Sequence, residues 1–90
     1  MAKEIEVQIK NNAGLHARPS ALFVQTVTQF NSEIKIISNG EEINGKSIMG
    51  LMLLAAEKGR ILKVVADGDD ADAALEKIKQ LVEVDKFGEE

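Results

Sequence analysis

The chain has 90 residues, with 15 acidic and 11 basic side chains and a net charge of −4. This length predicts one domain, residues 1–90, whose single modest core favours a surface site over an enclosed substrate cavity. The negative charge and the absence of Trp and Tyr argue against direct binding of nucleic acid. The absence of Cys excludes disulfides and thiolate metal sites, and a single His excludes a multi-histidine metal site. We therefore expect no metal and no cofactor.

The first ten residues, MAKEIEVQIK, alternate charged and apolar side chains and contain no apolar run of signal-peptide or membrane-span length. We therefore expect a cytoplasmic protein that does not insert into a membrane. We also expect a monomer.

The first half of the chain predicts a strand, a helix and a hairpin. Residues 4–10 alternate strictly, which is typical of a strand with one buried face, and turn-forming residues 11–14 follow. Residues 17–28 predict a helix, because apolar side chains recur there at helical spacing: Ala21, Phe23, Val24, Val27 and then Phe30. Residues 33–38 and 41–44 predict two strands joined by the tight turn Asn39-Gly40.

The second half predicts a helix, a strand and a final helix. Ser47 is expected to cap a short helix over residues 48–56 that Gly59 ends. The nearly continuous apolar run over residues 60–66 predicts a strand near the centre of a sheet. Asp69 or Asp70 is expected to cap the last helix, whose buried stripe is Ala74, Leu75, Ile78, Leu81 and Val82.

The predicted order of elements is βαββαβα. The economical packing for this order is an α+β fold, an open-faced two-layer sandwich. In it, a four-stranded antiparallel sheet carries three helices on one face.

The segment Gly14-Leu15-His16-Ala17-Arg18-Pro19 places the one histidine where a helix begins, because proline is best tolerated in the first helical turn. Free backbone amides and the helix dipole make such a terminus a natural anion site, and Arg18 adds a permanent cation. An imidazole beside an anion site is a candidate phosphoryl acceptor. From the spacing alone, however, a capping or solvent-exposed surface histidine is the simpler interpretation.

The chemistry of a phosphoryl acceptor fits these residues. The helix terminus and Arg18 disfavour a cationic ring, and a nucleophilic imidazole must be neutral. After transfer, the backbone amides of Ala17 and Arg18 and the Arg18 guanidinium are expected to bind the phosphoryl oxygens.

The segment after Ser47 is more apolar than a short amphipathic helix needs, since it contains Ile48, Met49, Leu51, Met52 and Leu53. Part of this set should therefore be exposed, and methionine suits a surface that fits several partners. The alternative is that both methionines fill gaps in the core. Ser47 likewise has an ordinary role as a helix cap, although a phosphate there would meet amides already oriented toward an anion.

Three motifs together resemble the HPr family, the histidine-containing phosphocarrier proteins of the bacterial sugar phosphotransferase system. They are GLHARP near residue 15, NGKSIMG near residue 45, and Asp-Gly-Asp-Asp before the last helix. The resemblance covers residues 4–88 and implies the same open-faced βαββαβα sandwich.

The resemblance implies a carrier rather than an enzyme. His16, with Arg18 as its catalytic partner, would accept a phosphoryl group from enzyme I and pass it to enzyme IIA proteins. Ser47 would be phosphorylated by HPr kinase/phosphorylase, and a catabolite-control transcription factor is a further candidate partner. The resemblance also turns Met49 and Met52 outward, beside His16. The expected partner surface comprises Ala17, Ser20, Ile48, Met49, Leu51 and Met52.

One residue and one segment depart from the family pattern. Ala13 stands where many relatives carry Asn or Ser, so a side-chain hydrogen bond to the phosphoryl site is lost unless Asn12 replaces it. No Lys or Arg occurs between Arg18 and Glu33, where relatives often carry lysines that face enzyme I. Electrostatic steering should therefore be weaker.

Two other functions remain as alternatives. The chain could act mainly as a phosphoserine-dependent partner of transcription factors or metabolic enzymes, although a retained His16 argues against a purely regulatory role. The order of elements alone also fits a small-ligand domain of the ferredoxin-like type, which leaves the histidine and serine motifs unexplained.

Overall fold

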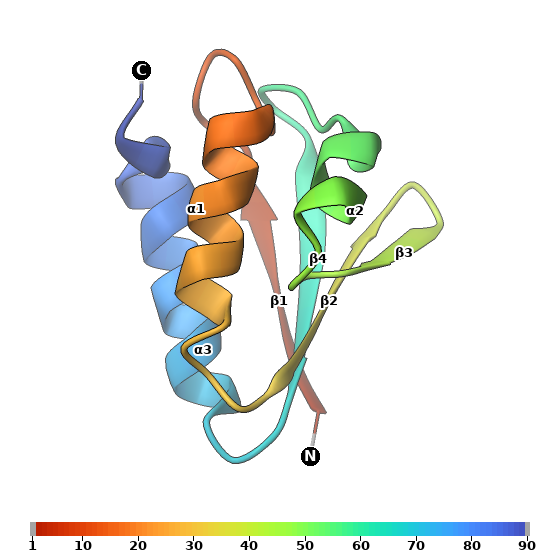
Figure 1. Cartoon of the computed structure of the whole chain (residues 1–90), viewed down its shortest axis with the longest axis vertical. Helices are drawn as coiled ribbons and strands as arrows, with labels where there is room; N and C mark the ends of the chain where they lie inside the picture. The colour runs from red at the N-terminus through yellow and green to blue at the C-terminus, as the bar shows by residue number, and fades with distance from the viewer. Residues whose placement is uncertain (1, 90) are drawn as a thin grey trace.

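The computed structural model describes residues 2–89, in which four strands form one antiparallel sheet with the order β1-β4-β2-β3. The strands are β1 (Ala2–Gln8), β2 (Glu33–Ser38), β3 (Glu41–Asn44) and β4 (Ile61–Asp67), and the helices are α1 (Ala17–Val27), α2 (Ile48–Leu54) and α3 (Ala71–Lys79). All three helices lie on one face of the sheet (Figure 1). The predicted open-faced βαββαβα sandwich is therefore confirmed.

The core lies between the sheet and the helices. Every second residue of the central strands points into it, and the helices contribute residues at helical spacing. Fully buried members of this core are Val7, Phe23, Val27, Ile34, Ile36, Leu51, Leu62, Val64, Ile78 and Val82. The placement of β4 between β1 and β2 confirms the central position that its apolar sequence predicts.

The observed bounds of the first and last strands differ from the predicted bounds by two residues and one residue, respectively. β1 covers Ala2–Gln8 rather than 4–10, because Ile9 hydrogen-bonds to the turn before β4 instead of a strand. β4 covers Ile61–Asp67 rather than 60–66, and Asp67 pairs in register with Ala2. The β2 and β3 bounds are as predicted, with the turn at Asn39 and Gly40 in the left-handed conformation.

The end of α2 differs from its prediction. The helix stops at Leu54, because Ala55 takes the left-handed conformation and closes it with an N–H···O bond to Met52. The following residue, Ala56, is buried, and its carbonyl accepts a hydrogen bond from Leu15. The helix therefore ends two residues before its predicted end, and the next residues pair with the loop before α1. Gly59 lies in the following turn and does not end the helix.

The start of α3 is also bonded differently from its prediction. Asp70 is the N-cap residue, but its side chain makes no cap hydrogen bond. Its carboxylate instead accepts hydrogen bonds from the Asn31 amide and from both the amide and hydroxyl of Ser32. Asp70 thus ties the start of α3 to the chain that follows α1.

After α3 the chain continues in a π-helical turn, η1 (Gln80–Val84), and a 3₁₀ turn, η2 (Lys86–Gly88). Glu83 in η1 accepts a 2.7 Å hydrogen bond from the amide of Gln8 at the end of β1, which lowers the pKa of the Glu83 carboxyl. Phe87 in η2 is buried in the core. These contacts hold η2 near the loop that precedes α1. No helix within residues 2–89 has the length and apolar character of a membrane span.

Candidate functional site

His16 is the N-cap residue of α1, as predicted, and its side chain makes no cap hydrogen bond. The first helical bond runs from the Ser20 amide to the His16 carbonyl, so the amides of Ala17 and Arg18 precede the first bonded turn. Pro19 has no amide proton. The imidazole is 43% exposed. It lies beside two first-turn amides with the positive end of the helix dipole.

The loop before His16 is held against Ala56, which follows α2. The Leu15 amide donates to the Ala56 carbonyl over 2.8 Å, and Leu15 itself is buried. Gly14 has a φ of +70°, and a Cβ at this position would collide with the Ala56 carbonyl oxygen. This close approach requires glycine and sets the direction in which His16 leaves the loop.

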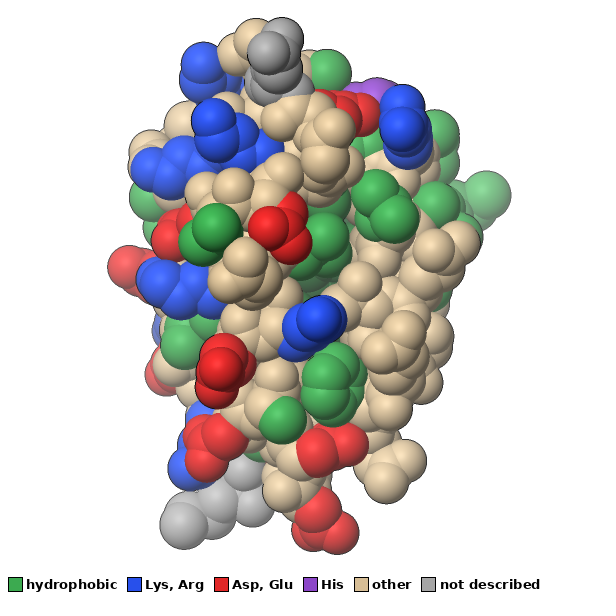
Figure 2. Space-filling model, turned by 90° about the vertical axis from the view of Figure 1, so that its left-hand side faces the viewer, with side chains coloured by type: hydrophobic (Ala, Val, Ile, Leu, Met, Phe, Trp, Pro, Cys, Tyr) green, Lys and Arg blue, Asp and Glu red, His purple; other side chains and the backbone are tan. Residues whose placement is uncertain are grey.

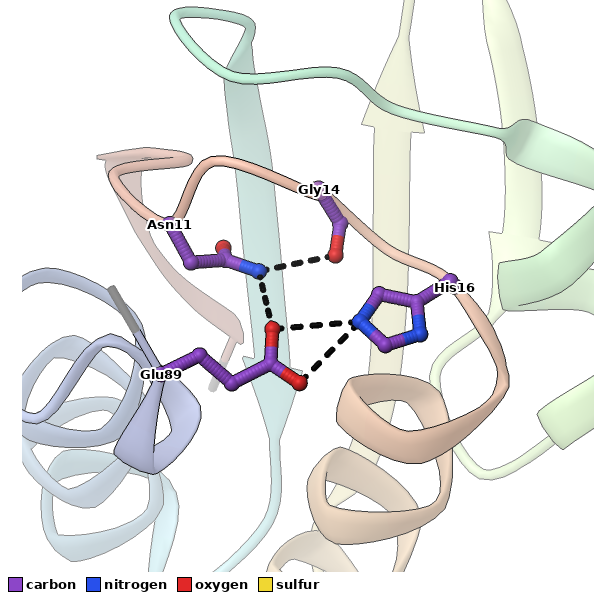
Figure 3. A network of polar contacts seen from close by, with 4 residues as sticks. All are labelled: Asn11, Gly14, His16 and Glu89. Atoms are coloured by element: carbon purple, nitrogen blue, oxygen red, sulfur yellow. Dashed lines mark hydrogen bonds and ion pairs between the residues drawn. The ribbon is translucent and has the colours of Figure 1, made fainter.

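A carboxylate that the sequence motifs do not predict contacts the histidine. Both oxygens of Glu89 lie 3.1 Å from Nε2 of His16, although the two residues are 73 positions apart (Figure 3). Nδ2 of Asn11, which is fully buried, donates to the Gly14 carbonyl and to Oε1 of Glu89. These four residues connect the loop before α1 to the segment after η2.

The electrostatics of this network favour an ionised Glu89. The hydrogen bond from His16 lowers the pKa of the Glu89 carboxyl below its usual value, and the hydrogen bond from Asn11 and the charge of Arg18 act in the same direction. Arg18 is exposed at the start of α1. The Arg18 charge thus acts on Glu89, the residue that contacts His16.

Asn12 does not take the place of the polar side chain that Ala13 lacks. Oδ1 of Asn12 instead accepts a hydrogen bond from Lys58 over 2.8 Å. The neighbouring Asn11 instead reaches the His16 network through Glu89.

A shallow pocket of about 280 Å³ lies between His16 and the end of α2. Its lining includes Leu15, Met52, Ala55 and Glu57. The pocket places Met52 beside His16, as expected. Met49 is also outward, with 73% of its surface exposed, so neither methionine is buried in the core.

Two residues of the expected partner surface are buried, and the prediction was wrong for them. Leu51 and Ser20 are fully buried. Leu51 lies on the inner side of α2 with Leu54, and Ser20 lies on the inner side of α1 with Phe23. The exposed set is therefore Ala17, Ile48, Met49 and Met52, together with Leu53, which is 80% exposed.

The charges around α1 are sparse. Arg18 is the one charged residue of this helix. Figure 2 looks onto the side of the molecule that α3 occupies, and there charged side chains are spread over much of the face while the right-hand edge, formed by α1, is largely uncharged. The structure therefore shows one charged side chain on α1, and weak electrostatic steering stays a prediction.

Ser47 caps α2 as predicted. Its Oγ accepts a 3.0 Å hydrogen bond from the Gly50 amide. The side chain is half-buried at the helix start, directly before the exposed Ile48 and Met49.

An exposed histidine at a helix N-terminus, on an open-faced sandwich with a shallow pocket beside that histidine, is the arrangement expected of a histidine phosphocarrier. The sequence profile described as "PTS HPr component phosphorylation site" matches residues 3–84. The chain therefore belongs to the HPr family of phosphocarrier proteins.

Individual relatives agree with this assignment. The phosphocarrier protein HPr of Xylella fastidiosa (strain Temecula1) is 42% identical over 97% of both chains. A crystal structure of HPr from Thermoanaerobacter tengcongensis is 48% identical over 98% of both chains, with a TM-score of 0.92. The crystal structure of Crh, described as a catabolite repression protein of Bacillus subtilis and as a domain-swapped dimer, is 44% identical, with a TM-score of 0.73 and coverage of 89% and 90%.

Proposed function

We propose that this chain carries phosphoryl groups from phosphorylated enzyme I, which receives them from phosphoenolpyruvate, to enzyme IIA proteins during sugar uptake. The observation that supports this most directly is the position of His16, the single histidine, half-exposed at the N-terminus of α1 in a chain of the HPr family. An exposed acceptor suits a carrier that must meet two partners in turn.

The acceptor atom in this proposal is Nδ1 of His16, since Nε2 is occupied by Glu89. The lone pair of Nδ1 forms the new P–N bond while the bond to the donor breaks and its electrons stay with the donor. The amides of Ala17 and Arg18 and the Arg18 guanidinium then bind the phosphoryl oxygens. The chain is a transient covalent carrier rather than a free-standing catalyst, and it needs no metal or cofactor of its own.

The docking surface for enzyme I and enzyme IIA is the exposed apolar group around His16, formed by Ala17, Ile48, Met49, Met52 and Leu53. Flexible methionines let one patch fit several partners. Because α1 carries a single charge, apolar contact is expected to contribute more to docking than charge attraction.

Ser47 is the regulatory site in this proposal, phosphorylated by HPr kinase/phosphorylase. A phosphate on Oγ would lie at the start of α2, where the backbone amides favour an anion. It would also lie next to Ile48 and Met49 of the docking surface. Phosphorylation there should therefore act on partner binding rather than on folding.

A regulatory role is the second candidate, because the similar Crh structure is described as a catabolite repression protein. In that role, phosphorylated Ser47 would bind a transcription factor or metabolic enzyme, and phosphoryl transfer for sugar transport would be a minor activity. The retained His16 favours the carrier. A monomer remains the predicted oligomeric state. Because the similar Crh structure is described as a dimer, the oligomeric state of this chain should be measured.

The test is incubation with enzyme I and phosphoenolpyruvate, followed by mass measurement before and after mild acid. A carrier gains one phosphoryl group that acid removes, as a phosphoramidate requires. A group that resists acid, or no addition at all, would refute phosphoryl transfer to His16.

A further inference from the structure

The Glu89 carboxylate is held in a defined place against His16. Its two oxygens contact Nε2 at 3.1 Å, and Oε1 also accepts the 3.0 Å hydrogen bond from the buried Asn11 (Figure 3). The Glu89 side chain is 16% exposed, whereas His16 is 43% exposed. The histidine can therefore meet a partner while its Nε2 edge stays covered by Glu89.

This contact determines which ring nitrogen carries the proton. An ionised carboxylate only accepts hydrogen bonds, and the lowered pKa of Glu89 keeps it ionised near neutral pH. In the neutral imidazole the proton must then be on Nε2. Nδ1 keeps its lone pair and points away from Glu89 (Figure 3).

We propose that Glu89 is a positioning residue for phosphoryl transfer, which holds the proton on Nε2 of His16 and counterbalances the positive charge that the ring gains when Nδ1 takes the phosphoryl group. This proposal rests on the proposed function, because it requires His16 to be the acceptor. It adds a residue that the GLHARP motif does not contain.

The transfer step balances without any proton movement. The Nδ1 lone pair forms the P–N bond, the donor keeps the electrons of the broken bond, and the ring becomes a cation that still carries Nε2–H. When the group leaves, the P–N electrons return to Nδ1 and a neutral imidazole remains. A carboxylate that fixes the tautomer of an imidazole and stabilises its cation serves the same purpose in hydrolase triads.

The opposing effect is repulsion between Glu89 and the phosphoryl group. Glu89 contacts the ring at Nε2, whereas the phosphoryl group would be bonded to Nδ1, which points away from Glu89 (Figure 3). Coulomb energy falls with distance and water screens exposed charges strongly, so the nearer attraction should prevail.

The decisive experiment is single-turnover transfer from phospho-enzyme I to the wild type, Glu89→Gln and Glu89→Asp. Glutamine keeps an oxygen that accepts the Nε2 proton but carries no charge. We expect transfer to Glu89→Gln to slow by about three- to tenfold, the size of one screened charge at contact distance, with enzyme I affinity unchanged. Glu89→Asp should recover part of the rate. Equal or faster transfer to Glu89→Gln overturns the proposal.

The matched control is Glu76→Gln, which removes the same charge from an exposed position on α3. Glu76 lines a surface hollow with Phe30, beyond the opposite end of α1 from His16. Its rate should equal that of the wild type. A slowing in Glu76→Gln as large as in Glu89→Gln would show that only net charge matters and would refute a local role.

Nitrogen-15 NMR of the ring supplies a readout that a purely structural role would not change. The chain has one histidine, so the ring signals belong to His16. We expect the wild-type ring to carry its proton on Nε2, with slower exchange into water than in Glu89→Gln. A wild-type ring protonated mainly on Nδ1 would overturn the proposal.

A small-molecule phosphoryl donor, the reagent phosphoramidate, can distinguish failure of this proposal from failure of the proposed function. It phosphorylates imidazole directly, without enzyme I, and releases ammonia. If it labels His16 more slowly in Glu89→Gln while phospho-enzyme I labels no variant, the role of Glu89 stands and the carrier function fails. If phospho-enzyme I labels wild type and Glu89→Gln equally, the carrier function stands and the role of Glu89 fails.

Discussion

The backbone amide of Leu15 donates a 2.8 Å hydrogen bond to the carbonyl of Ala56, and this bond joins the loop that carries His16 to the residues that follow α2. The approach is close enough that Gly14 has no room for a Cβ. This hydrogen bond therefore links the loop that carries His16, the proposed phosphoryl acceptor, to the end of the helix that Ser47 caps.

The first prediction concerns Gly14→Ala. Alanine at a φ of +70° is strained, and its Cβ would also push the Ala56 carbonyl away. We expect a loss of about 3 kcal/mol of unfolding free energy, measured by urea denaturation, together with slower phosphorylation of His16. Gly40→Ala is the control, because Gly40 has a similar φ of +82° but open space around a Cβ. It should cost only about 1 kcal/mol, and equal losses in both variants would contradict a steric role for Ala56.

The second prediction is that His16→Ala abolishes phosphorylation from phosphoenolpyruvate but leaves the fold and the phosphorylation of Ser47 intact. His16 is the single imidazole, and its side chain makes no cap hydrogen bond. Circular dichroism and mass spectrometry after incubation with each donor check the two halves. An acid-labile phosphoryl group on the alanine variant would show that another residue is the acceptor.

A third prediction assigns Arg18 to the phosphoryl group rather than to docking. Arg18→Glu should slow single-turnover transfer in both directions by roughly ten- to hundredfold, the worth of a charge-assisted hydrogen bond, while enzyme I affinity falls less. Lys77→Glu on α3 makes the same charge change at an exposed position and should leave the rate unchanged. An unaltered rate in Arg18→Glu would remove Arg18 from the phosphoryl site.

A fourth prediction follows from the hydrogen bonds to Asp70. The hydroxyl of Ser32 lowers the pKa of this carboxyl most, and the amides of Asn31 and Ser32 add to the effect. A lowered folded-state pKa means that the ionised form stabilises the fold above the unfolded value of 3.8 and that this contribution is lost as pH falls through the lower folded value. Asp70→Asn should therefore be less stable than wild type at pH 7, and the difference should shrink in acid.

Thermal unfolding of Asp70→Asn at several pH values measures this effect. Asp69→Asn removes a charge from the neighbouring exposed position and serves as the control. A stability difference for Asp70→Asn that stayed constant down to pH 2 would show that the carboxylate charge is not the cause.

The parts of the fold that depend on local chemistry could be predicted from the sequence. Asn39-Gly40 specified its turn because both residues accept a positive φ, and Ser47 specified the start of α2 through its side-chain cap. The apolar run of β4 indicated its central place between β1 and β2, although its residues alternate between buried and exposed because the helices cover only one face of the sheet. His16 and the first turn of α1 were predictable from Pro19.

The parts that depend on contacts between distant segments could not be predicted. Glu89 reaches His16 across 73 positions, and no local pattern signals that contact. The left-handed Ala55 that ends α2 is set by the pairing of Ala56 with Leu15. In a helix as short as α2 nearly every residue is apolar, so the sequence did not show that Leu51 points inward.

The last prediction concerns Ser47 as a switch on phosphorylation of His16. A phosphate on Ser47 should leave the fold intact, because the Gly50 amide at the start of α2 already donates a hydrogen bond to a side-chain oxygen there. Its effect should fall on docking, since the dianion would lie beside Ile48 and Met49, which are 43% and 73% exposed. Docking against enzyme I would have to desolvate that charge, and the dianion would also repel an acidic partner surface.

Titration of enzyme I against unmodified, Ser47→Asp and Ser47-phosphorylated protein at two salt concentrations tests this switch. We expect phosphorylation to weaken binding by roughly tenfold or more, and Ser47→Asp to weaken it less because aspartate has one charge and fewer acceptor oxygens. High salt should restore the part of the affinity lost to repulsion but not the part lost to desolvation, because salt screens charges and leaves the cost of removing water unchanged. Equal affinities for all three proteins would refute an electrostatic switch at the docking surface.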